Sequence, residues 1–220
     1  MAQPPAHPAP VPVHAVIFDY GKVLSLAPTE ADWQQLASAC GILPVERFQQ
    51  AYWRFRDEYD LRAVTAFEYW NLVAATAGHR LDEATVRRIT ALDNGQWTRP
   101  NLSMVELARR LRRAGMRTAI LSNMQVEMLA ALRAKFAWLN EFEAQLYTCE
   151  IGVVKPQAEI YLLACRAVSC EPAYALFLDD KQGNIDGALN AGLQALLFDT
   201  PERQTLVESY LRACGFREQG

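Results

Sequence analysis

Short apolar runs recur along the chain, and each ends at a polar residue. Four runs rich in Val, Ile, Leu and Phe occupy residues 13–18, 118–121, 175–178 and 194–198. Runs of this length and composition are typical of strands that are buried on both faces of a parallel sheet. A weaker run at 145–148 is a candidate for a fifth strand.

Helical periodicity fills the intervals between the later runs. Apolar positions three and four residues apart predict helices over 103–114, 125–135, 157–168 and 183–191. Ser103 and Glu106 have the spacing of a capping box, and Gly115 marks the end of that helix. Alternating strands and helices predict an α/β fold with a parallel sheet wrapped by helices.

The interval between the first and second apolar runs breaks this alternation. It contains no convincing strand, and Thr65 with Glu68 forms a second possible capping box. The start and stop signals predict four amphipathic helices, at 29–40, 44–59, 65–77 and 82–95. A helical insert at this point is placed to cover the edge of the sheet.

These patterns divide the chain into three parts. We expect residues 28–97 to form a helical cap domain, inserted into a core domain of residues 13–27 and 98–220. Five prolines crowd residues 1–12, which predicts a flexible extended arm there.

Composition and charge narrow the class of protein. Among 220 residues, 51% are hydrophobic and 21% are charged, so the chain is not of the disordered class. The formal net charge of −3 gives no positive field for nucleic acid. Five cysteines without a C-x-x-C pair fit neither a disulfide framework nor a structural zinc site. Without an apolar run long enough to span a bilayer, we expect a cytoplasmic protein without membrane or nucleic-acid partners, and its oligomeric state is left open.

Candidate chemistry lies where the apolar runs end. Asp19, Ser122 and the pair Asp179 and Asp180 follow three of the runs, and Lys155 follows the weak fifth run. The carboxyl ends of parallel strands share one sheet edge, where ligands bind. Clustered carboxylates repel one another unless a cation lies among them, and their oxygens suit Mg²⁺, whereas a lysine and a serine suit a phosphate. This set predicts phosphoryl transfer through a carboxylate nucleophile.

Each of these residues also has an ordinary structural interpretation. An aspartate after a strand is commonly a turn or cap residue, and Ser122 with Asn123 would equally cap the next helix. Only the conjunction indicates a site. Receiver domains combine similar groups, but they place the acidic pair first, whereas this chain places it last.

Four segments, in this order, resemble motifs of the haloacid dehalogenase (HAD) superfamily. They are VIFDYGKVL at 16–24, ILSN at 120–123, GVVKPQAEIY at 152–161 and FLDDKQGNIDGA at 177–188. The resemblance is to the hydrolases of subfamily I, which carry a helical cap after the first strand. It implies a Rossmann-like parallel-sheet core with an inserted all-α cap, and the activity of a phosphoric monoester hydrolase.

The resemblance also implies roles for individual residues. Asp19 would attack phosphorus and form an aspartyl-phosphate. Ser122, Asn123 and Lys155 would hold the phosphoryl oxygens, and Lys155 would also offset the charge of the nucleophile.

A magnesium site is implied beside the nucleophile. Its ligands would be the carboxylates of Asp19 and Asp180 and the backbone carbonyl of Gly21. Asp179 and Asn184 would support the metal without binding it directly.

Gly21 departs from the pattern of most phosphatases in this superfamily. They carry at this position an aspartate that protonates the leaving group, and loss of a general acid costs about 10²- to 10⁴-fold in rate. The Asp-x-Gly arrangement resembles a group that acts on sugar 1-phosphates, whose leaving group is better than an ordinary alkoxide. We therefore expect a Mg²⁺-dependent phosphatase of small phosphorylated metabolites, such as sugar 1-phosphates.

Two alternatives remain open at this stage. One is a 2-haloacid dehalogenase-type hydrolase, which uses the first-strand aspartate without a metal. The other is a non-catalytic phospho-ligand binding protein. This alternative stays open because Gly21 replaces the general acid. Substrate specificity is expected to come from the cap, and its candidate residues are Trp53, Arg54, Arg56, Asp57, Tyr59, Trp70 and His79.

Overall fold

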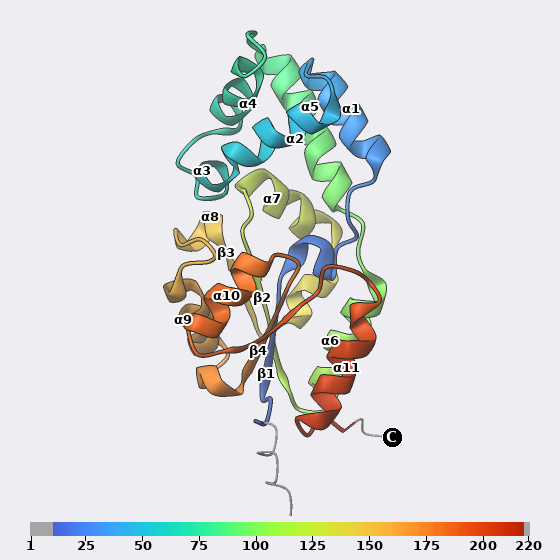
Figure 1. The fold of residues 1–220 in the computed structure, drawn as a ribbon, viewed down its shortest axis with the longest axis vertical. Coiled ribbons are helices and arrows are strands. Elements are labelled where there is room, and N and C mark those ends of the chain that lie inside the picture. The colour runs from blue at the N-terminus through green and yellow to red at the C-terminus, as the bar shows by residue number, and fades with distance from the viewer. Residues whose placement is uncertain (1–10, 218–220) are drawn as a thin grey trace, which may run out of the picture.

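The computed structural model describes residues 11–217 and contains a five-stranded sheet whose paired strands are all parallel (Figure 1). The strand order is β3-β2-β1-β4-β5, with β1 in the centre. The strands are β1 (Ala15–Phe18), β2 (Arg117–Ser122), β3 (Ala144–Tyr147), β4 (Ala175–Asp179) and β5 (Gln194–Leu197). The predicted α/β fold is therefore confirmed, including the weak fifth strand.

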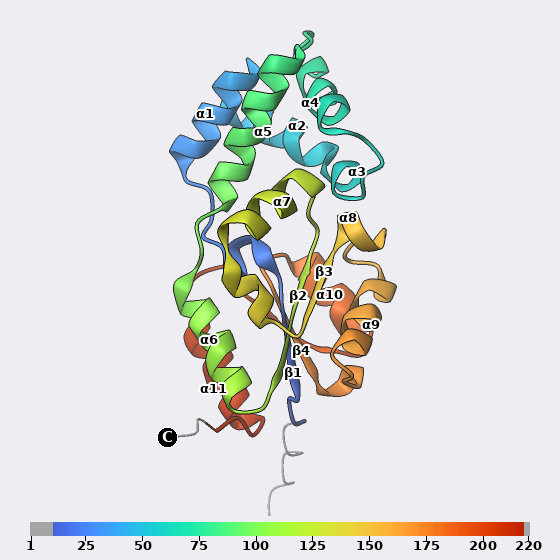
Figure 2. The ribbon, with the colours of Figure 1, turned by 180° about the vertical axis from the view of Figure 1, so that it is seen from behind.

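Helices cover both faces of the sheet because alternate strand residues point to opposite sides. Val16 and Phe18 pack on the side of α6 and α11, and Ile17 packs on the side of α9 and α10 (Figures 1 and 2). The core helices are α6 (Leu102–Arg113), α7 (Val126–Lys135), α8 (Thr148–Ile151), α9 (Ala158–Ala167), α10 (Gln182–Asn190) and α11 (Arg203–Ala213). Both faces of β1 are thereby removed from water.

Five helices between β1 and β2 form a bundle beyond the carboxyl ends of the strands, which we call the helical insert (Figure 1). They are α1 (Glu30–Cys40), α2 (Val45–Arg54), α3 (Arg56–Asp60), α4 (Ala66–Ala75) and α5 (Glu83–Trp97). Buried aromatic side chains, including Tyr52, Tyr69 and Trp70, fill its interior. The two connections to the core run side by side, since Ser25 and Pro100 form an antiparallel bridge.

The predicted helix over 44–59 is wrong, because the chain breaks at Phe55 into α2 and α3. Phe55 has φ −114° and ψ 12°, outside the helical region. Arg56, directly after the break, forms buried ion pairs with Asp60 one turn later in α3 and with Asp93 of α5. The short α8 and the final α11 were not predicted.

The predicted capping box of Ser103 and Glu106 is also wrong. Helix α6 begins earlier, with Asn101 as its N-cap, so Ser103 lies in the first turn and donates to Asn101 Oδ1 at 2.8 Å. Glu106 instead pairs with Arg113. The capping box of Thr65 and Glu68 is confirmed, with both reciprocal hydrogen bonds present.

Two further expectations concern the ends of the chain and the membrane. The arm predicted over residues 1–12 lies almost entirely outside the described residues. Within residues 11–217, no helix is both long enough and apolar enough to cross a bilayer.

Candidate active site

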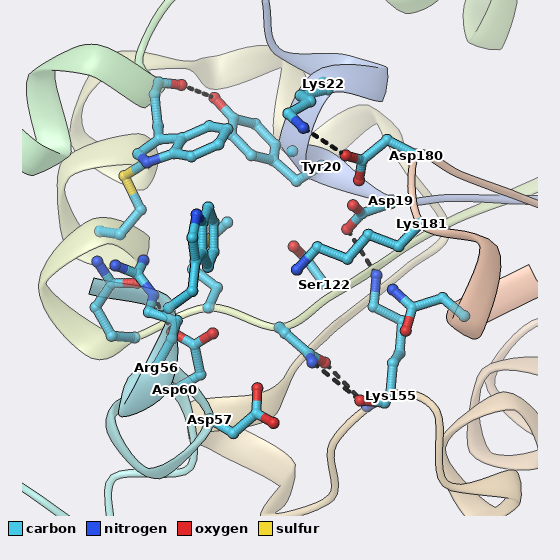
Figure 3. A pocket seen from close by; sticks show the side chains of 18 residues that line it. Asp19, Tyr20, Lys22, Arg56, Asp57, Asp60, Ser122, Lys155, Asp180 and Lys181 are labelled. Carbon is cyan, nitrogen blue, oxygen red and sulfur yellow. Dashed lines mark hydrogen bonds and ion pairs between the residues drawn. The ribbon is translucent and has the colours of Figure 1, made fainter. Parts of the chain in front are cut away.

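The register of the sheet brings the predicted site residues together. Phe18 pairs with Ile120 of β2 and with Leu178 of β4, so the next residue, Asp19, lies between the ends of those strands. Ser122 and Asp179 are the last residues of the same two strands. Figure 3 shows Asp19, Ser122, Lys155 and Asp180 grouped on the core side of one cavity.

Lys155 lies at the centre of this group and is 3% exposed. Its Nζ lies 2.8 Å from Asp19 Oδ1 and 2.6 Å from Asp179 Oδ2, and it donates to the carbonyl of Leu121 at 3.2 Å. Burial alone would lower the pKa of Lys155, but the charges of Asp179 and Asp19 raise it above its usual value. Lys155 is therefore a permanent cation beside the carboxylate of Asp19.

The carboxyl group of Asp19 is buried at the end of β1 beside Lys155. Its pKa is raised to about 6, mainly by burial and also by the charges of Asp179 and Asp180, against the lowering effect of Lys155. The ammonium of Lys155 therefore does not fully offset the cost of burying the ionised Asp19 carboxylate. An additional cation would stabilise the ionised form of Asp19.

The donor set fits Mg²⁺. One oxygen from each of Asp19, Asp179 and Asp180 lies within 4.8 Å of the others, and hard oxygen donors are what this ion prefers. Asp179 is already held by the protein, because Asn184 Nδ2 donates to its two oxygens at 2.9 and 3.0 Å. Asp19 and Asp180 are the other two carboxylates that could hold a metal, and Gly21, whose carbonyl is a further candidate, lies two residues after Asp19 in the chain.

Asn123 fixes the loop that carries Lys155. Its Nδ2 donates to the carbonyl of Lys155 at 3.2 Å, and its Oδ1 accepts from the Lys155 amide at 3.0 Å. The side chain of Ser122 is buried at the cavity wall, and its carbonyl accepts from Thr148 Oγ1 at 2.9 Å. Ser122 thus lies on the cavity wall, and the contacts of Asn123 hold the backbone of Lys155.

The cavity has a volume of about 490 Å³ and lies between the core and the helical insert. Of the predicted cap residues, Trp53, Arg56 and Asp57 line it. Arg54, Tyr59, Trp70 and His79 are not among its lining residues, and the ring of His79 is hydrogen bonded to the carbonyl of Cys40. Sequence reasoning missed these lining residues: Tyr20, Lys22, Asp60, Trp97, Met124, Gln125, Met128 and Lys181.

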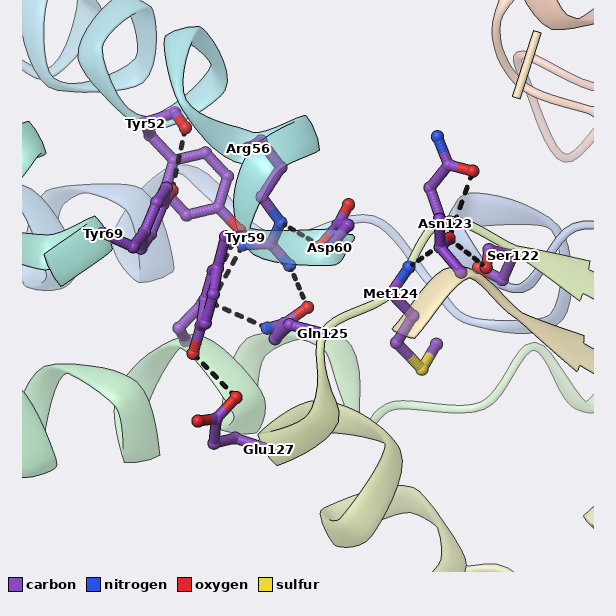
Figure 4. A network of polar contacts seen from close by, with 12 residues as sticks. Tyr52, Arg56, Tyr59, Asp60, Tyr69, Ser122, Asn123, Met124, Gln125 and Glu127 are labelled. Carbon is purple, nitrogen blue, oxygen red and sulfur yellow. Dashed lines mark hydrogen bonds and ion pairs between the residues drawn. The ribbon is translucent and has the colours of Figure 1, made fainter. Parts of the chain in front are cut away.

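Arg56 lines the cavity, but all its nitrogens are engaged (Figure 4). Its Nε donates to Asp60 at 2.9 Å, Nη1 donates to Asp93 at 3.1 Å, and Nη2 donates to Gln125 at 2.5 Å. Gln125 precedes the core helix α7, so this buried network joins the helical insert to the core. Arg56 is therefore a structural residue, and the acidic groups of Asp57 and Asp60 provide the polar wall opposite Asp19.

A second contact between the helical insert and the core lies at another side of the cavity. The ammonium of Lys181, which follows β4, lies 4.7 Å from the ring centroid of Trp53 in α2. The position of Lys181 directly after Asp180 was the only sequence signal for it.

Comparison with known proteins agrees with this architecture. The model of the family described as haloacid dehalogenase-like hydrolase matches residues 11–192. N-acetylmuramic acid 6-phosphate phosphatase of Pseudomonas aeruginosa is 27% identical over 187 residues, which are 81% of this chain and 78% of that protein. Acyl-CoA dehydrogenase family member 10 of Mus musculus is 29% identical over 129 residues, and this match spans 57% of this chain but only 11% of the mouse protein.

Solved structures share the fold at low identity. A HAD family enzyme from Bacteroides thetaiotaomicron, in complex with magnesium and inorganic phosphate, gives a TM-score of 0.67 at 18% identity and covers 84% of this chain and 93% of its own. L-2-haloacid dehalogenase from Xanthobacter autotrophicus gives a TM-score of 0.63 at 24% identity and covers 94% of this chain and 90% of its own. Because the family match spans most of the chain and the fold agrees, this protein belongs to the haloacid dehalogenase-like hydrolases.

Proposed function

We propose that this hydrolase is a Mg²⁺-dependent phosphatase of small phosphorylated metabolites. The observation that carries the proposal is the carboxylate of Asp19, which faces a cavity beside Lys155 and Ser122. The acidic pair after β4 supports a bound cation, which a dehalogenase mechanism does not need. The Pseudomonas relative is named a phosphatase, and the Bacteroides enzyme was solved with magnesium and phosphate.

The arrangement supports a two-step displacement. Lys155 and Ser122 would hold the phosphoryl oxygens while Asp19 attacks phosphorus, forming an aspartyl-phosphate as the bond from phosphorus to the leaving oxygen breaks. The leaving oxygen would take its proton from water. Water would then hydrolyse the aspartyl-phosphate and regenerate Asp19. Mg²⁺ held by Asp19, Asp180 and the Gly21 carbonyl would supply charge neutralisation for the transferring group.

The wall opposite Asp19 suits a polyol leaving group. Trp53 and Trp97 offer aromatic surface, and Asp57 and Asp60 offer carboxylates that accept hydrogen bonds from hydroxyl groups. Gly21 provides no general acid, so leaving groups of low pKa are favoured. Sugar 1-phosphates meet both conditions, and we propose them as the preferred substrates.

A panel of phosphate esters tests this proposal. Sugar 1-phosphates, sugar 6-phosphates, nucleotides, acyl phosphates and an aryl phosphate are assayed with Mg²⁺ or with EDTA. We expect metal-dependent phosphate release, fastest with the 1-phosphates and absent in Asp19→Asn. Chloride release from a 2-haloacid in EDTA, without any phosphate release, would instead identify a dehalogenase.

Gly21→Asp is expected to increase the hydrolysis of poor leaving groups by about 10-fold or more, because it supplies the missing general acid. The backbone permits the change: Gly21 has φ −63° and ψ 122°, and an added Cβ would meet its nearest neighbours, Asp19 Oδ2 and Trp97, at 3.7 Å. The measurement is kcat/KM on an alkyl phosphate and on an aryl phosphate. Gly21→Asn is the control, since it has the same size but no acid, and equal gains in both variants would contradict the explanation.

A further inference from the structure

Lys22 occupies an unusual backbone position close to the nucleophile. Its φ is +60°, in the left-handed region that residues other than Gly, Asn and Asp rarely adopt. The turn is held by the amide of Lys22, which donates to Ser25 Oγ at 3.2 Å, and by the amide of Ser25, which donates to the Tyr20 carbonyl at 2.8 Å. A long cationic side chain is therefore fixed at a site where the backbone favours glycine.

The side chain of Lys22 reaches across to Asp180. Its Nζ lies 2.8 Å from Asp180 Oδ2, which makes an ion pair with a carboxylate whose side chain is only 7% exposed (Figure 3). Within residues 11–217 this is the only side-chain partner of Asp180. Lys155 forms ion pairs with Asp19 and Asp179 in the same way. Each carboxylate of the acidic cluster thus has an ammonium beside it.

This pairing changes the charge that a metal ion would meet. The three carboxylates and the two ammonium groups leave the cluster with a net charge of −1, and without Lys22 it would be −2. Affinity for hard divalent cations rises with the negative charge of the ligand set. Repulsion between an ammonium and a divalent ion at contact range is large in a partly buried site.

We propose that the ammonium of Lys22 competes with Mg²⁺ for the carboxylate of Asp180. The ion pair between Lys22 and Asp180 thereby lowers the affinity of this site for Mg²⁺. This inference rests on the proposed function in one respect, the placement of Mg²⁺ at Asp180. The ammonium of Lys22 would leave Asp180 when this carboxylate holds a divalent ion. The displaced side chain has room to move, since it is 41% exposed and borders a second cavity beside Pro28 and Gln49.

The test is calorimetric titration of metal-free protein with MgCl₂ in the absence of substrate. Lys22→Met is expected to bind Mg²⁺ about tenfold more tightly than the wild type, because the competing charge is gone. Lys22→Arg keeps the charge and is expected to stay near the wild-type affinity. Asp180→Asn is expected to lose most of the binding.

Lys181→Met is the matched control. Lys181 is also a lysine that lines the same cavity and adjoins Asp180 in sequence, but its ammonium lies over Trp53. Removal of the Lys181 ammonium takes one positive charge from the cavity but leaves the ion pair between Lys22 and Asp180 intact. The Mg²⁺ affinity of Lys181→Met is therefore expected to change by less than about twofold. An equal gain in Lys181→Met and Lys22→Met would show a general field effect and overturn the proposal.

Two further outcomes decide the matter. Unchanged or weaker binding by Lys22→Met overturns the proposal, as does wild-type binding by Asp180→Asn. If Lys22→Met melts far below the wild type, Lys22→Gly removes the same charge and suits the left-handed backbone. Because no substrate is present, tighter binding by the variant supports the role of Lys22 even if the phosphate ester panel gives no turnover.

Discussion

Asp19→Asn is expected to lower phosphate release by on the order of 10³-fold or more and, at the same time, to stabilise the metal-free protein. The loss of activity follows because an amide cannot attack phosphorus. The gain in stability follows because the folded protein holds the Asp19 carboxylate at a cost, which burial imposes and Lys155 only partly offsets. We therefore expect Asp19→Asn to lower the rate of phosphate release and to raise the free energy of unfolding.

The stability effect should depend on pH in a defined direction. The pKa of Asp19 is about 6 in the folded protein and 3.8 in an unperturbed carboxyl group. The folded state therefore takes up the proton first as the pH falls, so the cost is complete above about pH 6 and disappears towards pH 4. At pH 7.5 the variant is expected to gain on the order of 1 to 3 kcal/mol.

Urea unfolding in EDTA at pH 7.5 and at pH 4.5 measures this difference. The advantage of Asp19→Asn in the free energy of unfolding is expected at pH 7.5 and should shrink at pH 4.5. Asp57→Asn is a suitable control, because Asp57 lines the same cavity but has a more exposed side chain. An unstable Asp19→Asn variant at pH 7.5 would show that the ion pair with Lys155 outweighs the cost of burial.

Lys155→Met is expected to destabilise the protein by about 3 to 5 kcal/mol, since it leaves the carboxylates of Asp19 and Asp179 buried without a cation. Phosphatase activity is expected to fall by about 10²-fold or more, because the transferring phosphoryl group loses its fixed positive charge. Methionine keeps the length of the side chain and makes the charge the main difference.

The double variant Lys155→Met with Asp179→Asn separates charge from packing. Removal of one orphaned carboxylate is expected to restore part of the lost stability, as measured by urea unfolding, but not the activity. Equal stability of Lys155→Met and the double variant would mean that packing around Lys155, not charge, causes the loss. A Lys155→Met variant as stable as the wild type would contradict the compensating role of this residue altogether.

Much of the candidate site follows from local patterns alone. Asp19, Ser122 and Asp179 end apolar strands, and parallel strands place their carboxyl ends at one edge whatever the details of packing. Lys155 was found because it follows the fifth apolar run. The same patterns predicted the helical character of the insert, although not the division into α2 and α3, because amphipathic periodicity is a property of the sequence alone.

Contacts between distant segments had no such signal. Arg56 is a predicted candidate for substrate contact, yet its guanidinium is engaged by Asp93 and Gln125, which lie far from it in the chain, as well as by Asp60 in its own helix. The break at Phe55, directly before Arg56, likewise had no signal in the apolar periodicity. Asn123 lines the cavity, and the contacts of its amide with the backbone of Lys155 had no signal in the sequence.

By itself, the sequence determined the order of the strands along the chain, the helical character of the insert and the carboxylates, hydroxyl and ammonium that meet at one sheet edge. The tertiary structure decided the sheet order, the pairing of Lys22 with Asp180 and the acidic wall of Asp57 and Asp60. The physical reason is the distance along the chain between the residues that set each feature. Hydrophobic periodicity and strand ends are set by neighbours along the chain, whereas an ion pair depends on where packing brings two side chains that no local pattern connects.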